Sequence, residues 1–459
     1  MTSTLNSIAA SAQPASAEGP NDQQNDHISA LRFITCGSVD DGKSTLIGRL
    51  LVDSRAVLQD HLAGVQRGGE TDLALLTDGL QAEREQGITI DVAYRYFTTG
   101  TRKYIIADAP GHEQYTRNMV TAASTADLAI ILIDARRGVL TQTRRHSYLT
   151  HLVNIPHLVV AINKMDLVDY SQDVFNKIMA DYLDFAAKLG IEDVRFVPMS
   201  ALNGDMVVER GDRLDWYTGP TLIDLLETVT ASHVEHEEPF RFPVQYVCRP
   251  QDSANPELHD YRGFMGRVES GSISVGDAVT VLPSGRETRI KDIQVLGQTL
   301  PTAYAEQSIA ILLEDEIDIS RGDMIVKTGE EPNVTKQFDA MLCWLSEAPL
   351  DPRRKYLIRH TTRDSKAMLA GIEYRTDVNT MEQVAADKLN MNDIAKVSFK
   401  LAQPIFPDPY TSNRGTGAFI DQGRAEIKSV LDERARFVEA ANDDMAQRFA
   451  AGREVRARV

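Results

Sequence analysis

The stretch with the clearest chemistry is residues 37–44, Gly-Ser-Val-Asp-Asp-Gly-Lys-Ser, which fits the phosphate-binding pattern Gly-x-x-x-x-Gly-Lys-Ser/Thr. Its glycines let backbone N–H groups approach phosphate oxygens without a Cβ clash. Lys43 is expected to reach the β- and γ-phosphates of a nucleotide, and the Ser44 hydroxyl is expected to bind Mg²⁺. The pattern requires a strand before it and a helix after it, and the sequence supplies an apolar run over 31–36 and helically spaced apolar residues over 44–52. The stretch therefore predicts a nucleoside triphosphate site at a helix N-terminus.

A second motif, Asn163-Lys164-Met165-Asp166, follows an apolar run over 158–162 and so lies at the C-terminal end of another predicted strand. The Asp166 carboxylate can accept hydrogen bonds from both the N1–H and the exocyclic amine of guanine. Adenine has no matching pair of donors, so it would leave a buried carboxylate unpaired at a cost of a few kcal/mol. We expect Asn163 to tie the base to the phosphate loop and Lys164 to lie along the purine plane. The order and spacing of the two motifs predict that the nucleotide is GTP.

The guanine site is completed by Ser200-Ala201, which follows a predicted strand over 195–198 and can bring a backbone N–H to the guanine O6. The residues expected to bind GTP are Gly37, Ser38, Val39, Asp40, Asp41, Gly42, Lys43, Ser44 and Thr45 in the phosphate loop, Asp108, Ala109, Pro110, Gly111 and His112 near the γ-phosphate, and Asn163, Lys164, Met165, Asp166, Ser200, Ala201 and Leu202 around the base.

The groups for hydrolysis are expected between these motifs, where a predicted strand over 103–107 ends at Asp108-Ala109-Pro110-Gly111-His112. Asp108 is expected to hold Mg²⁺ through a water molecule, and the Gly111 N–H is expected to meet the γ-phosphate. His112 stands where GTPases keep a side chain that orients the attacking water. A lone loop histidine would not support that role, but a histidine directly after this motif does.

A polar segment over 83–90 contains Thr89 and precedes a β-rich run over 91–97. Thr89 is the expected switch residue, because its hydroxyl and carbonyl can contact Mg²⁺ and the γ-phosphate and release them after hydrolysis. The alternative is a polar loop that simply enters a strand. The sequence thus predicts Lys43, Thr89 and His112 as catalytic residues, and Ser44, Thr89 and Asp108 as the Mg²⁺ site.

These residues resemble the translation-factor class of GTPases, and within it the GTPase subunit of bacterial heterodimeric sulfate adenylyltransferase (ATP sulfurylase) more than the elongation factors. Elongation factors typically carry His-Gly-Lys-Thr at the end of the phosphate loop, where this chain has Asp41-Gly42-Lys43-Ser44. The similarity spans about 31–419, and the stretches that carry it are 77–97, 108–119, 240–247, 360–363 and 374–380.

The resemblance implies a GTPase domain followed by two β-barrels, with GTP and Mg²⁺ bound to the first. It also implies that GTP hydrolysis drives the synthesis of adenosine 5′-phosphosulfate and pyrophosphate from ATP and sulfate. In that family the adenylyl transfer occurs on a separate, smaller catalytic subunit that holds ATP and sulfate, in a heterodimer or an assembly of heterodimers. An elongation-factor-like carrier of aminoacyl-tRNA is the alternative function, and Asp41, Ser44 and the run 77–97 favour the first one.

The rest of the chain agrees with that division of labour. An adenylyl-transfer site of the pyrophosphatase-loop type needs a further loop such as Ser-Gly-Gly-x-Asp, and none follows Ser44. Residues 266–276 contain glycines, but they predict a strand–turn–strand hairpin of a barrel. No second Gly-Lys-Ser/Thr loop precedes Val459, so we expect no fused adenylylsulfate kinase.

The composition indicates a multidomain cytoplasmic protein. The 459 residues, 42% of them hydrophobic, suffice for about three ordinary domains. A net charge of −17 argues against non-specific nucleic-acid binding, although it leaves a local basic face open. Cys36, Cys248 and Cys343 are expected to be reduced core residues, with oxidation of Cys36 beside the phosphate loop as the alternative. No apolar run approaches the roughly 18 residues of a membrane span. The N-terminal residues lack a basic start and an apolar core, so we expect that they are not a secretory signal.

The expected fold class is an α/β phosphate-loop GTPase domain, a parallel sheet with helices on both faces, followed by two small β-barrel domains made of short strands. The expected segments are a disordered N-terminus (1–27), the GTP-binding domain (28–232), a charged linker (233–239), a first barrel (240–330), a second barrel (335–421) and a C-terminal helical tail (422–459). Helical spacing over 424–451 departs from the family pattern, so we expect the second barrel to lack a strand. The tail would cover the barrel edge or a partner, or it would be a solvated end.

Overall fold

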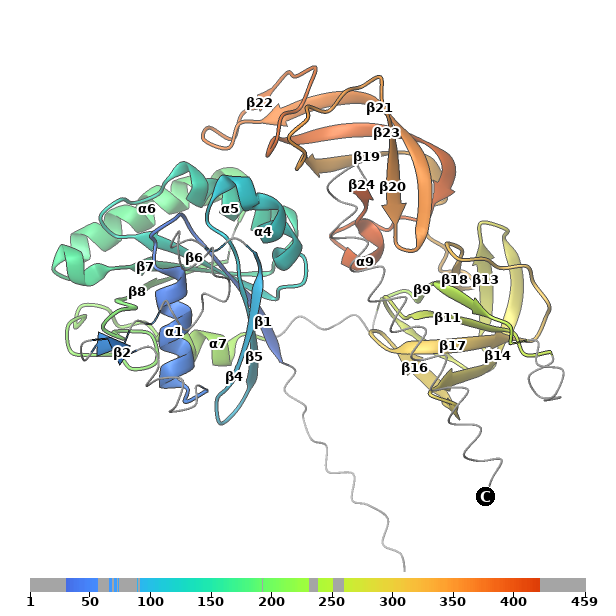
Figure 1. The fold of residues 1–459 in the computed structure, drawn as a ribbon, viewed down its shortest axis with the longest axis horizontal. Helices are drawn as coiled ribbons and strands as arrows, with labels where there is room; N and C mark the ends of the chain where they lie inside the picture. Colours follow the sequence, from blue (N-terminus) through green and yellow to red (C-terminus); the bar gives the residue numbers. More distant parts are fainter. Residues whose placement is uncertain are drawn as a thin grey trace, which may run out of the picture.

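The computed structural model describes residues 30–56, 91–191, 193–230, 238–250 and 260–421, together with residues 66–67 and 70–71, Leu73 and Thr89. These residues form an α/β domain followed by two β-sheet domains (Figure 1). The fold class expected from the sequence is therefore confirmed. Four expected features lie outside the described residues: the N-terminal segment 1–27, residues 233–237 of the linker, most of the run 77–90, and the tail 422–459.

The α/β domain is built on a six-stranded sheet with the order β4-β5-β1-β6-β7-β8. Its strands are β1 (Leu31–Cys36), β4 (Ala93–Thr98), β5 (Lys103–Asp108), β6 (Leu128–Asp134), β7 (His157–Asn163) and β8 (Val194–Pro198). Neighbouring strands are parallel except β4 and β5, which are antiparallel. Every residue of β6 is buried, because a parallel sheet covered on both faces needs the continuous apolar runs that mark these strands in the sequence. A separate ribbon pairs β2 (Gln66–Arg67) with β3 (Glu70–Thr71).

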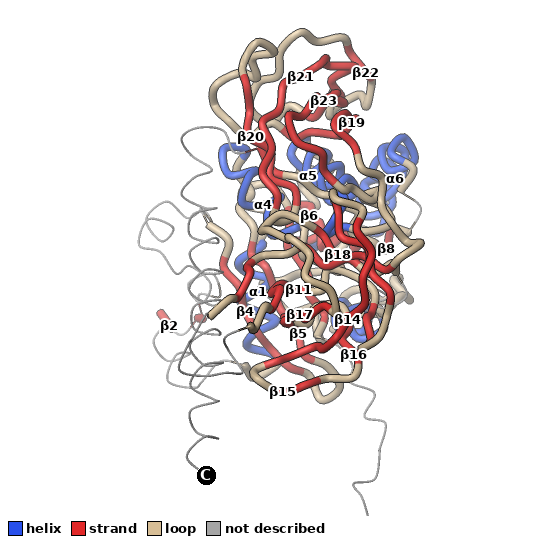
Figure 2. Tube along the Cα trace, turned by 90° about the vertical axis from the view of Figure 1, so that its right-hand side faces the viewer, coloured by secondary structure: helices blue, strands red, loops and turns tan. Residues whose placement is uncertain are grey.

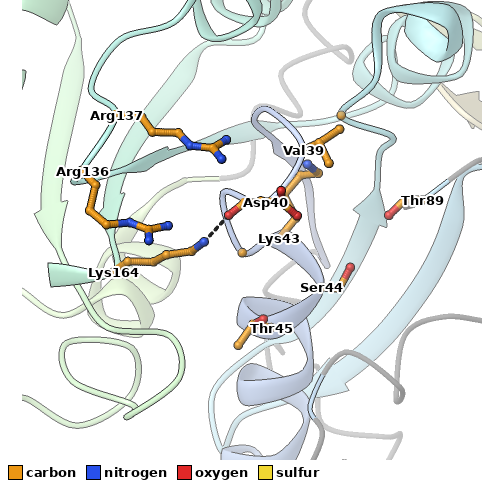
Figure 3. A pocket seen from close by; sticks show the side chains of 11 residues that line it. Val39, Asp40, Lys43, Ser44, Thr45, Thr89, Arg136, Arg137 and Lys164 are labelled. Atoms are coloured by element: carbon orange, nitrogen blue, oxygen red, sulfur yellow. Dashed lines mark hydrogen bonds between the residues drawn. The ribbon is translucent and has the colours of Figure 1, made fainter. Parts of the chain in front are cut away.

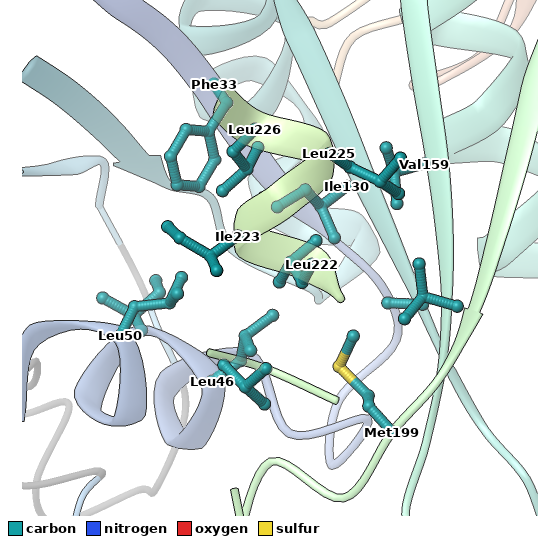
Figure 4. Packing of buried hydrophobic residues seen from close by; sticks show 14 of the residues in the cluster. Phe33, Leu46, Leu50, Ile130, Val159, Met199, Leu222, Ile223, Leu225 and Leu226 are labelled. Carbon is teal, nitrogen blue, oxygen red and sulfur yellow. The ribbon is translucent and has the colours of Figure 1, made fainter. Parts of the chain in front are cut away.

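Helices cover both faces of this sheet, because successive strand residues point to opposite sides. Phe33 of β1 packs with α1 (Lys43–Asp53) and α7 (Leu222–Thr228), as Figure 4 shows. Its neighbour Ile34 belongs to the core on the other face, which is covered by α4 (Thr116–Ala123), α5 (Thr141–Leu152) and α6 (Gln172–Leu189). Two short 3-10 turns, η2 (Glu113–Tyr115) and η3 (Met165–Val168), follow β5 and β7. None of the described helices combines the length and the apolar character that crossing a membrane would demand.

The loops that carry the predicted chemistry all leave one edge of this sheet. The strand β1 leads into the loop 37–44, β5 ends at Asp108, β7 ends at Asn163 and β8 leads to Ser200. These are the carboxyl ends of parallel strands, where open α/β sheets bind their ligands. The topology therefore brings motifs that are far apart in the sequence to one place.

The first β-sheet domain has the strand order β10-β11-β17-β14-β13-β18-β9, with β15 paired to β14 and β12 paired to β16. Its strands are β9 (Arg241–Pro243), β10 (Tyr246–Cys248), β11 (Gly263–Arg267), β12 (Ser272–Ser274), β13 (Ala278–Leu282), β14 (Arg286–Val295), β15 (Gln298–Thr299), β16 (Thr302–Tyr304), β17 (Ser308–Leu313) and β18 (Met324–Lys327). Phe240, Phe242, Phe264 and Ile293 fill its interior. These short strands around one core agree with the expected barrel.

The hairpin expected over 266–276 is wrong. The strand β11 pairs with β10 and β17, whereas β12 pairs with β16. Between the two strands, the carbonyl of Ser270 accepts the Arg241 N–H at 3.1 Å. This contact draws the chain toward β9, so it cannot fold back on β11.

The second β-sheet domain has the order β19-β23-β21-β20-β24, with β22 on β21. Its elements are β19 (Thr335–Cys343), β20 (Lys355–His360), β21 (Arg363–Thr376), β22 (Gln383–Val384), β23 (Ile394–Ile405), the short helix α9 (Arg414–Gly417) and β24 (Ile420–Asp421). The expectation of short strands is wrong here, because β21 has 14 residues and β23 has 12. Their pairing shifts register between Leu369 and Gly371 and again between Ile372 and Tyr374. Such irregularities bend a long strand pair, which lets it curve around one core.

Hydrogen bonds join the three domains. Arg241 of the first barrel makes two hydrogen bonds to the Asp408 carboxylate, at 2.9 and 3.0 Å, and Thr416 donates to the same group at 2.6 Å. The second barrel lies beside α4 and α5 of the α/β domain (Figure 2). There the Tyr148 hydroxyl is 3.3 Å from the Thr376 hydroxyl, and both are buried.

Candidate nucleotide-binding site

A cavity of about 420 Å³ opens at the carboxyl edge of the α/β sheet (Figure 3). Five chain segments line it: the phosphate loop with the start of α1, Thr89, Gly111 after β5, the end of β6 and the end of β7. The lining residues are Val39, Asp40, Gly42, Lys43, Ser44, Thr45, Thr89, Gly111, Arg136, Arg137 and Lys164. The structure thus brings together nine residues that the sequence predicts for the nucleotide or its metal, and adds two arginines that it did not predict.

The phosphate loop folds around the ammonium group of Lys43. The Lys43 Nζ donates to the carbonyls of Gly37 at 3.0 Å and Ser38 at 2.8 Å. Burial lowers the pKa of Lys43, although the nearby Asp41 and Asp108 carboxylates oppose this shift. A buried cation held mainly by neutral carbonyls lacks a full anionic partner, and a triphosphate in the cavity would supply one.

Asp41 places a carboxylate inside the same loop. Its Oδ2 accepts the Ser38 N–H at 2.6 Å, and the side chain is almost fully buried. Burial raises the pKa of Asp41 to about 6, although Lys43 and the Ser38 N–H partly oppose this. The loop therefore carries a group that titrates close to neutral pH.

Asn163 connects the guanine motif to the phosphate loop. Its Nδ2 donates to the Asp41 carbonyl at 2.8 Å, and its Oδ1 accepts the Ala201 N–H at 2.9 Å. The contact is so close that a Cβ on Gly42 would collide with the Asn163 amide, and Gly42 also has a positive φ of 92°. A residue other than glycine at position 42 would therefore push the two motifs apart.

Asp166 is oriented by Ser200, whose hydroxyl donates to the Asp166 Oδ1 at 2.7 Å. Ala201, which was expected to reach the guanine O6, here directs its N–H at Asn163, so a bound guanine would share or take over this donor. Two residues of the predicted set face away from the cavity. Met165 is buried in the domain core, and the Leu202 side chain is 62% exposed while its carbonyl accepts a hydrogen bond from Arg49.

The segment after β5 packs directly on the phosphate loop. A Cβ on Gly111 would collide with the Lys43 Nζ and lie 2.7 Å from the Gly37 carbonyl, so only glycine allows this approach. Asp108 is buried at the end of β5, and its charge acts on Lys43. The His112 side chain does not line the cavity: its Nδ1 accepts the Gln114 N–H at 3.3 Å, which caps η2.

Four residues at the site were not predicted from the sequence. Asp134, at the end of β6, is fully buried and pairs with Arg136 (2.6 Å) and Lys164 (3.2 Å). Burial alone would raise the pKa of Asp134, but hydrogen bonds from Arg136 and Lys164 outweigh it and lower the pKa to about 2. The neighbouring Arg137 lines the cavity as well. The signal in the sequence was their position at the end of an apolar run, the same place that marks Asp108 and Asn163.

His146 of α5 is the fourth residue that was not predicted. Its Nδ1 accepts the Gly37 N–H at 3.2 Å, so it holds the first residue of the phosphate loop. Burial, together with the charges of Lys43 and Arg145, lowers the pKa of His146 to about 3, so this imidazole is neutral. Nothing in the polar sequence around it indicated this contact, because the packing of α5 on the sheet creates it.

Two family models match the chain. One, described as the elongation factor Tu GTP binding domain, matches residues 29–234, and the other, described as GTP-eEF1A C-terminal domain-like, matches residues 337–423. Both matches agree with a translation-factor type of GTPase in which β-sheet domains follow the nucleotide-binding domain.

Much longer similarities extend over all three domains. The sulfate adenylyltransferase subunit 1 of Aliarcobacter butzleri is 54% identical over 407 residues, which are 87% of this chain and 85% of that protein. The proteins of the same name from Alteromonas mediterranea (52% identity, 87% of this chain, 85% of that protein) and Chromobacterium violaceum (54%, 86% and 84%) are similar to the same extent. The chain therefore belongs to the sulfate adenylyltransferase subunit 1 family, within the translation-factor class of GTPases.

Proposed function

We propose that the chain is the GTPase subunit of a sulfate adenylyltransferase, in which GTP hydrolysis drives the synthesis of adenosine 5′-phosphosulfate and pyrophosphate from ATP and sulfate. The observation that carries the nucleotide assignment is the pair of hydrogen bonds made by Asn163, to the Asp41 carbonyl and from the Ala201 N–H. Together they hold the guanine motif beside the phosphate loop. The name shared by the relatives supports the reaction.

GTP would bind with Mg²⁺ in the cavity at the carboxyl edge of the sheet. Lys43 would transfer its hydrogen bonds from the loop carbonyls to the β- and γ-phosphates. Ser44 and Thr89 line this one cavity, and Asp108, buried at the end of β5, acts electrostatically on Lys43 in the lining, so three oxygen-bearing side chains suit a cation that prefers oxygen ligands. The bound ion would neutralise part of the phosphate charge.

The guanine would be read at the outer end of the site. Asp166, held by Ser200, would accept hydrogen bonds from the two donors of the guanine edge. Lys164 donates to the Asp40 carbonyl and pairs with Asp134, which would keep its aliphatic stem along the purine plane. A backbone N–H at Ala201 would reach the guanine O6.

Hydrolysis would need a small rearrangement at the γ-phosphate end of the site, away from the guanine. The Gly111 N–H would meet the γ-phosphate, and the His112 side chain would turn from the cap of η2 toward the cavity to orient the attacking water. Thr89 would contact Mg²⁺ and the γ-phosphate while GTP is bound and would release them after cleavage.

The adenylyl transfer itself would take place on a smaller catalytic partner that holds ATP and sulfate. The relatives are named as one subunit of an adenylyltransferase, and no Ser-Gly-Gly-x-Asp loop follows Ser44 in this chain. The two chains would form a heterodimer or an assembly of heterodimers, without nucleic acid or membrane. We place the complex in the cytoplasm, where free thiols such as those of Cys36, Cys248 and Cys343 stay reduced.

The other function considered from the sequence was an elongation-factor-like carrier of aminoacyl-tRNA. The relatives that match most of this chain carry the adenylyltransferase name, which favours the first function. A filter-binding assay separates the two, because the proposed function predicts no GTP-dependent retention of aminoacyl-tRNA.

Copurification tests the proposal as a whole. The full chain, coexpressed with a smaller adenylyltransferase, should yield a complex of roughly equal stoichiometry whose GTP hydrolysis is stimulated by ATP and sulfate together. The Lys43→Ala complex is the matched control and should lose both GTP hydrolysis and the GTP-dependent gain in adenosine 5′-phosphosulfate. A GTPase rate that does not respond to ATP and sulfate would contradict the proposal.

A further inference from the structure

Two consecutive arginines, Arg136 and Arg137, line the nucleotide cavity directly after β6. Figure 3 shows both guanidinium groups directed toward the phosphate loop, on the side opposite Thr89. Both side chains are exposed. Exposed arginines on a loop are most often simply solvated. Whether these two have a further role depends on the hydrogen bonds and ion pairs that their side chains make.

The partners of the two arginines differ. Arg136 is held by the buried Asp134, to which its Nε and Nη2 donate at 3.0 and 2.6 Å. Lys164 shares that carboxylate, and Lys43 donates to loop carbonyls. Arg137 has no hydrogen-bond or ion-pair partner for its side chain among the described residues. Among the described residues that line the cavity, Arg137 is therefore a second cation, besides Lys43, that an anionic ligand can engage.

The backbone that carries Arg137 is firmly anchored. The Arg137 N–H donates to the Asp134 carbonyl at 2.9 Å, and the Ala135 N–H donates to the Asn163 carbonyl at 2.9 Å. This turn is thereby fixed to the strand end that supplies the guanine motif. A side chain on such a support is placed with little loss of backbone entropy when it meets a ligand.

The negative charges of the phosphate loop explain why the binding of a triphosphate would benefit from a cation such as Arg137. The phosphate loop contributes two carboxylates of its own, Asp40 in the lining and Asp41 beneath it, and both repel a triphosphate. Arginine is always protonated, and its planar fork matches phosphate oxygens with two hydrogen bonds. Negative charge that develops during phosphoryl transfer is stabilised by such groups.

We propose that Arg137 contacts the triphosphate and stabilises the charge that develops during hydrolysis, so that this chain supplies its own catalytic arginine. In this step the water oxygen forms a bond to the γ-phosphorus, and the bond to the β–γ bridging oxygen breaks with its electron pair passing to GDP. Both protons of the water end on the released phosphate, which leaves as dihydrogen phosphate and can pass one of them to solvent. Arg137 donates hydrogen bonds and exchanges no proton. The inference rests on the proposed GTP site.

The test compares Arg137→Ala, Arg137→Lys and a control, Arg286→Ala, in the full chain. Arg286 is an exposed arginine of β14 in the first barrel. Three quantities are measured: the single-turnover rate of GTP hydrolysis, the dissociation constant of fluorescent GDP, and the binding of aluminium fluoride to the GDP complex, which mimics the transferring phosphoryl group.

We expect Arg137→Ala to slow single-turnover hydrolysis about 10- to 100-fold. GDP affinity should change less than about threefold, and aluminium fluoride binding should be lost. Arg137→Lys should recover part of the rate, and Arg286→Ala should match the wild type. A hydrolysis rate for Arg137→Ala within about twofold of wild type, or equal losses in GDP affinity and rate, would overturn the assignment.

A Lys43→Ala variant keeps this outcome separate from a failure of the proposed site. If Lys43→Ala still binds GTP, the nucleotide lies elsewhere and the proposed site fails. If Lys43→Ala loses binding while Arg137→Ala hydrolyses GTP normally, the site stands and only the role of Arg137 fails.

Discussion

The side-chain amide of Asn392, in the second barrel, donates a hydrogen bond of 2.8 Å to the backbone carbonyl of Glu113, the residue that follows His112. The Glu113 carboxylate in turn accepts a hydrogen bond from Arg145 of α5 at 3.0 Å. The segment expected to sense the γ-phosphate is thus tied both to its own domain and to a β-sheet domain.

Removing the hydrogen bond from Asn392 to Glu113 should make residues 112–118 more mobile. An exposed hydrogen bond contributes about 0.5–1.5 kcal/mol, so Asn392→Ala should increase amide hydrogen exchange over residues 112–118 by up to about tenfold. Asn390→Ala is the matched control, because Asn390 lies in the same loop and its side chain makes no hydrogen bond within the described structure. Equal exchange in both variants would show that Asn392 does not hold the segment.

Asp166→Asn should change the base that the site prefers from guanine to xanthine. The substitution turns a carboxylate acceptor into an amide that also donates, and xanthine offers a carbonyl where guanine has its amine. Ser200 keeps the new side chain in place, because its hydroxyl already donates to Asp166 at 2.7 Å. Competition between fluorescent GTP and XTP measures the change, with Asp169→Asn, an exposed carboxylate nearby, as the control. Unchanged preference for GTP would rule out the role of Asp166.

His112→Ala should slow GTP hydrolysis while leaving GTP affinity nearly unchanged. General acid–base assistance to the attacking water contributes roughly 10²–10⁴-fold, and the His112 side chain caps η2 and is not among the residues that line the cavity. Stopped-flow binding and single-turnover hydrolysis report the two effects separately. Equal losses in both quantities would argue that His112 supports the fold of the loop instead.

Asp41→Asn should stabilise the protein above neutral pH. Burial raises the pKa of Asp41 to about 6, so the folded state favours the protonated form. The stabilisation from this proton is fully present below the unfolded pKa near 4 and is lost as the pH rises through 6. An amide keeps the hydrogen bond from Ser38 and carries no charge, so Asp41→Asn should gain about 3 kcal/mol at pH 8 and only about half of that at pH 5, where the folded Asp41 is still mostly protonated.

Thermal unfolding of both proteins at pH 5 and pH 8 measures this difference. The titration of His146, whose pKa is lowered to about 3, is common to the two proteins and cancels in the comparison. A melting temperature that is raised equally at both pH values would mean that the charge of Asp41 is not the cause.

The features of the fold and the site that could be predicted from the sequence are those that depend on short, local sequence motifs. The phosphate loop, Asp108 and the Asn163 motif each follow a mostly apolar run. Such a run is typical of a parallel strand that is buried on both faces. Ordinary α/β topology then brings strand ends together, which is why Lys43, Thr89, Gly111 and Lys164 meet in one cavity.

The parts that could not be predicted depend on packing between distant segments. The hydrogen bond from Gly37 to His146 exists only because α5 packs under the loop, and the pairing of β12 with β16 follows from the contact between Arg241 and Ser270. The length of β21 was not predicted either, because register shifts let one long strand curve around the core where short strands were expected.

Isothermal titration calorimetry of the full chain with Mg²⁺ and either GTP or ATP, repeated with Lys43→Ala, tests guanine selectivity at this site. We expect one GTP site per chain, affinity for ATP lower by at least about 100-fold, and loss of GTP binding in the variant. Tight binding of ATP that Lys43→Ala abolishes, with no heat from GTP, would contradict this selectivity.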